Sequence, residues 1–250
     1  MQTYEGARRT TKVRSRKGNC TYGWMFHYMP IGRGHCVELQ PTPEQRVKMF
    51  KIEREWIKEG YFIADFWNCG VITNGCISAA RPGGYFYVDW DGDVTPCVFI
   101  PYSSINIKEV FAKGGTLNDV INDSFMKDIR AWQRSYGYEP KSPSEVQNQI
   151  GCCAIRDHYD NFRRILEKNE VKPIDQDAKE ALESEEYYKK MVEYDLLLKK
   201  LSDPIWKNEY LIPSLKKKKK SFFINTLKVS FTTVSYTHLR AHETSLHLVC

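Results

Sequence analysis

Apolar and polar positions along the chain fall into helix-like periods separated by short apolar runs. Residues 41–60 carry apolar side chains at helical spacing, which predicts an amphipathic helix. The apolar runs at residues 23–32 and 61–67 are typical of buried strands. A helix between two such strands predicts a β-α-β unit of a parallel sheet. The end signals of this helix are an N-cap, a proline at the first position, a capping-box glutamine and a terminal glycine: Thr42, Pro43, Gln45 and Gly60.

The following stretch predicts a β-hairpin and then helices. Asp91–Gly92 is a two-residue turn signal inside the strand-like residues 83–102. Helical patterns follow from near Ile105 to Gly114 and then from the N-cap Thr116 onward. Two more helices are predicted, the second of them long and charged, over residues 154–169 and 173–201. We therefore expect a mixed α/β chain with a helical C-terminal part.

Composition and charge narrow the class of protein. Hydrophobic residues make up 42% of the chain, which is typical of a globular protein. The net charge of +6 comes from two terminal patches, residues 8–17 and 216–220, so we expect no nucleic-acid partner. The sequence has no apolar run of membrane-spanning length and no secretory signal, which predicts a cytoplasmic protein without a membrane partner.

Eight cysteines are therefore expected in a reducing compartment, where structural disulfides are rare. Cys69 and Cys76 each adjoin a glycine, and Cys97 follows the predicted hairpin. With one distant thiol from Cys152–Cys153, they would complete a four-thiolate site for an iron–sulfur cluster or a zinc ion. Burial as plain hydrophobic residues is the alternative, and Cys20 and Cys36 are expected to be structural thiols of this kind.

Several motifs together resemble the C-terminal half of a radical SAM protein with a SPASM or twitch auxiliary domain: GWMFHYMPIGR, PTPEQR, DFWNCG, GGYFYVDWDGDVTPCVFIPY and RDHY. The resemblance covers about residues 17–212 and implies the end of a partial (β/α) barrel followed by an α+β auxiliary domain. It implies that Cys69, Cys76, Cys97 and Cys153 hold one auxiliary 4Fe–4S cluster, with Cys153 preferred to Cys152 for its spacing to RDH.

The chain contains no CxxxCxxC sequence, the loop that holds the S-adenosylmethionine cluster in this family. The resemblance therefore implies a fragment that does not cleave S-adenosylmethionine alone and whose parent acts on a peptide or small-molecule substrate. Residues 234–244 resemble a translated sequencing adapter. The expected organisation is a non-native leader, the barrel end, the auxiliary domain, a helical tail and an artefactual end: 1–16, 17–68, 69–170, 171–212 and 213–250.

Other polar residues carry weaker expectations. The resemblance places Arg33 at the mouth of the barrel, where an arginine can bind a carboxylate of substrate or S-adenosylmethionine. His27 is expected to be a hydrogen-bonded core histidine, and Asp157 and His158 to cap the last helix. Asp65 is expected to be structural and without a partner. A zinc-binding structural module and a metal-free interaction domain remain as alternatives to the enzyme fragment.

Overall fold

The fold is taken from a computed structural model that describes residues 23–65, 67–68, 70–139 and 142–213. The predicted leader and nearly all of the predicted artefactual end lie outside these residues, as do Cys20 and Cys69. The described chain is mixed α/β, as predicted, and it contains no closed barrel. The predicted domain boundaries at residues 68/69 and 170/171 stay predictions.

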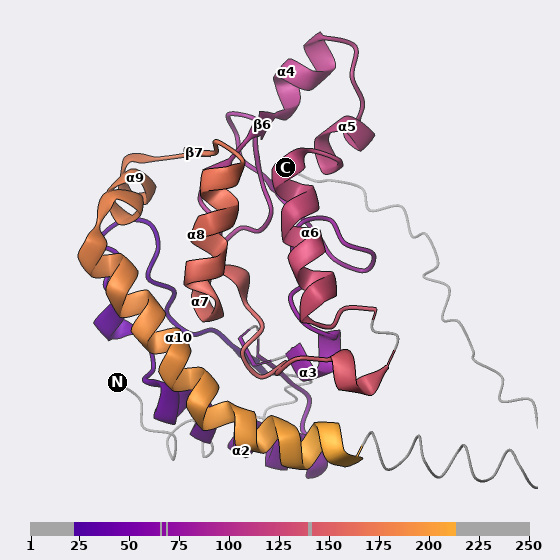
Figure 1. Ribbon diagram of the computed structural model, residues 1–250, viewed down its shortest axis with the longest axis vertical. Helices are drawn as coiled ribbons and strands as arrows, with labels where there is room; N and C mark the ends of the chain where they lie inside the picture. The colour runs from indigo at the N-terminus through magenta and orange to yellow at the C-terminus, as the bar shows by residue number, and fades with distance from the viewer. Residues whose placement is uncertain (1–22, 66, 69, 140–141, 214–250) are drawn as a thin grey trace, which may run out of the picture. The chain divides into compact units, whose positions relative to one another are not determined.

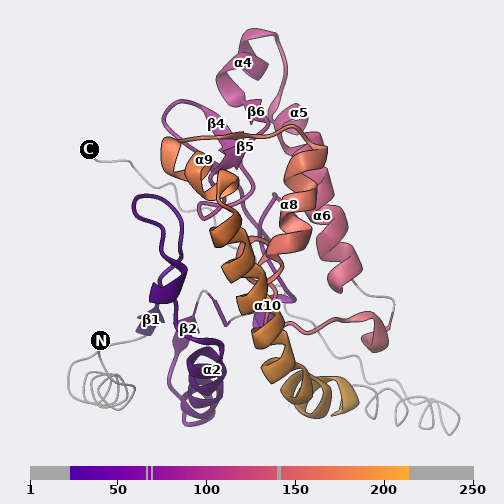
Figure 2. The same ribbon diagram turned by 60° about the vertical axis from the view of Figure 1, so that its left-hand side comes forward.

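The described chain begins with the predicted β-α-β unit (Figure 2). Strands β1 (Gly23–Met25) and β2 (Ile63–Asp65) pair in parallel, and α2 (Pro43–Lys58) connects them. The register sets Gly23 opposite Ile63 and Met25 opposite Asp65. The strands are shorter than the apolar runs that predicted them, because the chain turns away after Met25 through loops and a short 3-10 helix, η1 (Val37–Leu39).

Helix α2 forms where the sequence predicts it. Thr42 Oγ1 accepts a hydrogen bond from Gln45 N at 3.3 Å, and Gln45 Oε1 accepts one from Thr42 N at 3.0 Å, which completes the capping box. Gly60 has a φ of +89° and follows the helix, a conformation that favours glycine. The buried face is not purely apolar, because it consists of Pro43, Arg46, Met49, Phe50, Glu53 and Trp56.

Short strands form the middle of the chain after α3 (Gly70–Thr73). An antiparallel sheet has the order β3-β4-β6, and a second antiparallel pair joins β5 to β7. The predicted hairpin is present, but its loop has three residues between Asp89 and Asp93, because Gly92 adopts a φ of +88°. The bounds are Tyr87–Val88 for β3, Asp93–Thr95 for β4, Tyr102–Ser103 for β5, Ile105–Asn106 for β6 and Lys172–Pro173 for β7.

Each long helical pattern of the C-terminal half is divided in two. Asp123 Oδ2 accepts a hydrogen bond from Phe125 N at 2.9 Å, and Ser184 Oγ accepts one from Tyr187 N at 3.1 Å, so these residues begin new helices. A third division falls at His158. The helices are α4 (Ile107–Ala112), α5 (Leu117–Ile121), α6 (Ser124–Tyr136), η2 (Pro143–Glu145), α7 (Ala154–Asp157), α8 (Tyr159–Lys168), α9 (Gln176–Glu183), α10 (Glu185–Ile205) and the π-helical η3 (Trp206–Leu211).

The main hydrophobic core lies between α6, α8 and the short strands, and α6 and α8 run side by side (Figure 1). Phe162 on α8 is fully buried, and its ring lies 6.0 Å from that of Tyr102 and 6.5 Å from that of Phe125. Helix α10 contacts α2, α7 and α8, so the C-terminal part closes over the N-terminal unit. None of the described helices combines the length and the apolar character that a membrane crossing requires.

Candidate metal centre

One of the four predicted thiols contacts the hydroxyl group of Tyr85, and two others are near enough for their charges to act on it. The hydroxyl lies 2.8 Å from Cys97 Sγ. Burial raises the pKa of Tyr85, and the charges of Cys97, Cys76 and Cys153 raise it further. The charges of Cys76 and Cys97 also act on Cys153. The structure therefore brings together thiols from three segments that are far apart in the sequence.

Cys97 is positioned by the end of the hairpin. Pro96 O accepts a hydrogen bond from Ala79 N at 2.7 Å, which ties the segment before Cys97 to the loop that follows Cys76. Phe99 N donates to Cys97 Sγ at 3.5 Å. Burial raises the pKa of Cys97 to about 12, and the charge of Cys76 acts in the same direction. Cys97 is therefore held as a neutral thiol when no cation is near.

Cys76 is positioned by the buried side chain of Arg81. Arg81 donates hydrogen bonds to the backbone carbonyl groups of Thr73, Asn74 and Gly75, at 2.6, 3.3 and 3.4 Å. These carbonyl groups directly precede Cys76. Gly75 has a φ of +92°, and a Cβ there would lie 2.7 Å from Gln149 Oε1, so a larger residue would disturb the turn.

Cys153 is the N-cap residue of α7, and Asp157 fixes its backbone. Asp157 Oδ2 accepts a hydrogen bond from Cys153 N at 2.9 Å. The neighbouring Cys152 lies against the segment that follows Cys69, since a Cβ on Gly70 would be 2.5 Å from Cys152 Sγ. Cys153, with its place beside Cys76 and Cys97, is the better candidate of the pair. Cys69, the remaining predicted ligand, lies outside the described residues, so its part in the site stays a prediction.

The described thiols fit thiolate ligation of a metal. Burial raises the pKa of Cys153, as it does that of Cys97, and each thiolate charge further disfavours its neighbours. A bound cation reverses this balance, because the metal attracts the thiolates and replaces the protons. Cys97 and Cys153, which burial keeps protonated, are therefore suited to bind a metal or an iron–sulfur cluster.

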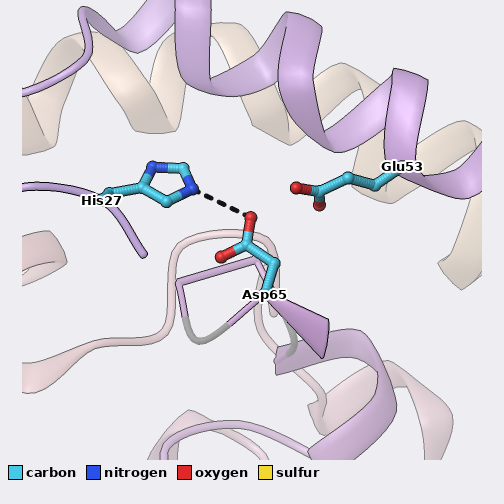
Figure 3. Close-up of side chains that lie close together, drawn as sticks. All are labelled: His27, Glu53 and Asp65. Carbon is cyan, nitrogen blue, oxygen red and sulfur yellow. Dashed lines mark hydrogen bonds and ion pairs between the residues drawn. The ribbon is translucent and has the colours of Figure 1, made fainter. Parts of the chain in front are cut away.

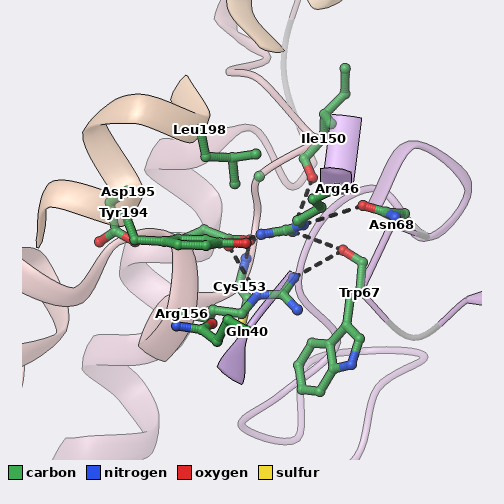
Figure 4. A network of polar contacts seen from close by, with 12 residues as sticks. Gln40, Arg46, Trp67, Asn68, Ile150, Cys153, Arg156, Tyr194, Asp195 and Leu198 are labelled. Carbon is green, nitrogen blue, oxygen red and sulfur yellow. Dashed lines mark hydrogen bonds and ion pairs between the residues drawn. The ribbon is translucent and has the colours of Figure 1, made fainter. Parts of the chain in front are cut away.

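A buried charge network lies beneath Cys153 (Figure 4). Arg46 on α2 forms an ion pair with Asp157 on α7 and donates a second hydrogen bond to Asp157 Oδ2 at 2.9 Å. Arg156 Nε lies 3.1 Å from Asp157 Oδ1. Burial alone would raise the pKa of Asp157, but the two guanidinium groups hold it well below its ordinary value. This charged Asp157 is the group that accepts the Cys153 N–H.

A second polar cluster connects the two parallel strands to α2 (Figure 3). His27 Nε2 and Asp65 Oδ2 share a hydrogen bond of 2.9 Å, which agrees with the expectation for a core histidine. The expectation that Asp65 has no partner is wrong, because the β-α-β unit brings it to His27. Glu53 faces this pair from α2, and burial together with Asp65 raises the pKa of Glu53 to about 10.

Sequence reasoning assigned no role to Arg46 and Glu53, although the sequence contains a signal for both. They lie seven positions apart, in phase with Met49 and Trp56, on the side of the helix that is otherwise apolar. A charged residue at such a position needs a buried partner. The partners could not be identified from local sequence, since Asp157 lies 111 positions from Arg46.

The remaining candidates have simpler positions. Arg33 is exposed in a turn between Gly32 and Gly34, which have φ angles of +71° and +64°. His158 does not cap α8 with its side chain, contrary to expectation; its Nε2 lies 3.0 Å from Gly151 O, and its ring lies 4.5 Å from that of Tyr136. The role of Arg33 in binding a cofactor therefore stays a prediction.

Comparisons of the chain with known protein families, with curated proteins and with solved structures found no match.

Proposed function

We propose that this chain carries the auxiliary 4Fe–4S cluster of a radical SAM oxidoreductase of the SPASM or twitch type. The observation that supports the proposal is the contact of Cys97 with Tyr85, together with the charges of Cys76 and Cys153 that act on the same hydroxyl group. Cys69 is proposed as the fourth ligand. The parallel β-α-β unit is the element expected at the end of a partial (β/α) barrel, and it supports the same assignment.

The residues of the chain have defined tasks in this proposal. Arg81 and Asp157 hold the backbone at Cys76 and Cys153. The Tyr85 hydroxyl group and Cys97 Sγ share a hydrogen bond, in which the hydroxyl group is the donor once the thiol has become a thiolate ligand. Such hydrogen bonds tune the reduction potential of a cluster. The cluster, when bound, supplies electron transfer or a binding point for a peptide or small-molecule substrate. S-adenosylmethionine belongs to the parent enzyme, and Arg33 is proposed to meet its carboxylate or that of the substrate.

Anaerobic reconstitution with iron and sulfide tests the proposal. We expect about four irons per chain and a broad visible absorbance, as for a 4Fe–4S cluster. Cys97→Ser should lose most of both, because it removes a central ligand. Cys36→Ser is the matched control, since Cys36 Sγ donates a hydrogen bond to Glu38 at 3.1 Å in a separate pocket also lined by Lys190. Its iron content should equal that of the unaltered chain.

Two outcomes would contradict the proposal. One tightly bound zinc with sulfur ligands and no chromophore would assign the thiols to a structural zinc site. Equal iron content in Cys97→Ser and Cys36→Ser would remove Cys97 from any metal site and favour a metal-free interaction domain. Circular dichroism of both variants checks that the fold is kept.

A further inference from the structure

Glu53 is a buried carboxyl group that interacts with Asp65 and Asn68 but forms no hydrogen bond of ordinary geometry. The residue is 0% exposed, and within the described chain neither of its side-chain oxygens has a hydrogen bond. A buried polar group in that state costs free energy unless something else satisfies it. Figure 3 shows the carboxyl group directed at the His27–Asp65 pair. The unsatisfied oxygens thus point toward two further groups that can bind a metal.

The ligand atoms of His27, Glu53 and Asp65 all lie within 4.8 Å of one another. His27 Nε2 and Asp65 Oδ2 are 2.9 Å apart, close to the separation of about 3 Å for neighbouring ligands whose bonds to one ion are about 2.1 Å. We propose that these three residues bind one divalent transition-metal ion such as Zn²⁺, at a site separate from the cysteines.

The surroundings of Asp65 resemble the outer shell of a metal ligand. Asp65 Oδ1 accepts hydrogen bonds from Trp67 N at 2.7 Å and from Asn68 N at 3.3 Å. Asn68 Nδ2 donates to Asp65 Oδ2 at 2.9 Å, and Arg46 Nε donates to Asn68 Oδ1 at 3.3 Å. Such contacts orient a ligating carboxylate before the ion arrives. The frame is rigid, because its members belong to β2 and α2 and the segments next to them.

The donor types and the charge also suit this ion. One imidazole and two carboxylates are ligands for zinc and similar first-row metals. With both carboxylates ionised their formal charge is −2, which a divalent ion neutralises, and both orphaned oxygens of Glu53 gain a partner. Acid–base catalysis fits less well, since the side chains of His27 and Asp65 are 2% and 1% exposed and give a substrate no access.

Zinc binding by the full chain and by Glu53→Gln tests the inference. Glutamine keeps the shape of the side chain but loses the ligand charge. We expect the unaltered chain to bind one zinc with a purely nitrogen and oxygen shell near 2.0 Å by X-ray absorption, apart from any zinc on sulfur near 2.3 Å. Glu53→Gln should lower the affinity for that zinc by more than about 100-fold, because substitutions of residues that only contact the ligands already lower metal affinity by about 10–100-fold. Glu55→Gln, exposed on the same helix, should bind as the unaltered chain does.

Equal zinc stoichiometry and affinity in Glu53→Gln and Glu55→Gln would overturn the inference, and so would a sulfur shell on all bound zinc. Either result would leave Glu53 as a protonated carboxyl group facing Asp65. If Glu53→Gln does not fold, His27→Gln serves as the second variant with the same expectation. Iron–sulfur reconstitution depends on the cysteines alone. A negative result for the zinc site would therefore not contradict the proposed cluster function, and a negative result for the cluster would not contradict the zinc site.

Discussion

Replacing Arg46 by leucine is expected to lower the free energy of unfolding by about 3–5 kcal/mol, the cost typical of removing one partner from a buried ion pair. Arg46 is 0% exposed and forms its ion pair with Asp157, which would remain buried beside Arg156 alone. The arginine also donates hydrogen bonds to Asn68 Oδ1 and Trp67 O, at 3.3 and 3.0 Å; Asn68 Oδ1 would lose this donor, and Trp67 O would keep Arg156 at 3.2 Å. Urea unfolding followed by circular dichroism measures the change.

Arg164→Leu is the matched control for this substitution. Arg164 forms an ion pair with Asp160 at 2.7 Å, but the arginine side chain is 67% exposed. Exposed pairs of this kind contribute little to stability, so the midpoint in urea should barely move. If Arg46→Leu lowered the free energy of unfolding by no more than Arg164→Leu does, the buried charge network would not contribute substantially to stability.

The second large effect concerns pH. With metal removed by a chelator, Glu53 is expected to lower the free energy of unfolding by about 2 kcal/mol between about pH 7 and pH 8.5. The pKa of Glu53 rises from 4.5 to about 10 on folding, so the folded chain keeps a proton that the unfolded chain has lost. Stability therefore decreases as pH rises through this window.

Asp195 contributes a slope of the same sign, because burial raises its pKa well above the ordinary value. The pKa values of His27 and His158 are lowered by burial, so their effect ends below this window. Glu53→Gln should make the free energy of unfolding less dependent on pH, because one titrating carboxyl group is removed. At pH 8.5 this variant should be more stable than the unaltered chain. Glu55→Gln should keep the full slope. Equal slopes for the two variants in urea titrations would show that Glu53 is ionised in the folded protein.

Local signals predicted the N-terminal part of the fold well. The capping box at Thr42 and the apolar runs beside α2 depend on residues near in sequence, and the β-α-β unit is present. The predicted long helices were wrong in their continuity, because Asp123 and Ser184 each begin a new helix within an otherwise helical pattern. A polar residue in a helical pattern is compatible with one continuous helix or with two helices that meet at that residue. Tertiary packing decides which of the two forms.

For the candidate sites, too, local sequence signals predicted some features and missed those that depend on distant residues. Glycines beside cysteines indicated a metal site, and the charges of three of the predicted thiols act on Tyr85, but the metal site itself stays a prediction. Arg46 and Glu53 could not be given partners, since their partners come from other elements and the helical pattern carries no information on what faces it. Asp65 was expected to be alone for the same reason, although His27 lies beside it through the pairing of β1 with β2.

The contact between Asp157 and Cys153 has a consequence for assembly. Arg46 and Asp157 are 111 residues apart, so their ion pair closes one of the longest loops in the described chain. A ribosome exposes Cys76 and Cys97 well before α7 has been made, and contacts of such long range form late in folding. The proposed cluster therefore requires synthesis to pass α7, and a stalled nascent chain ending before residue 150, which lacks Cys153, is expected to hold iron poorly.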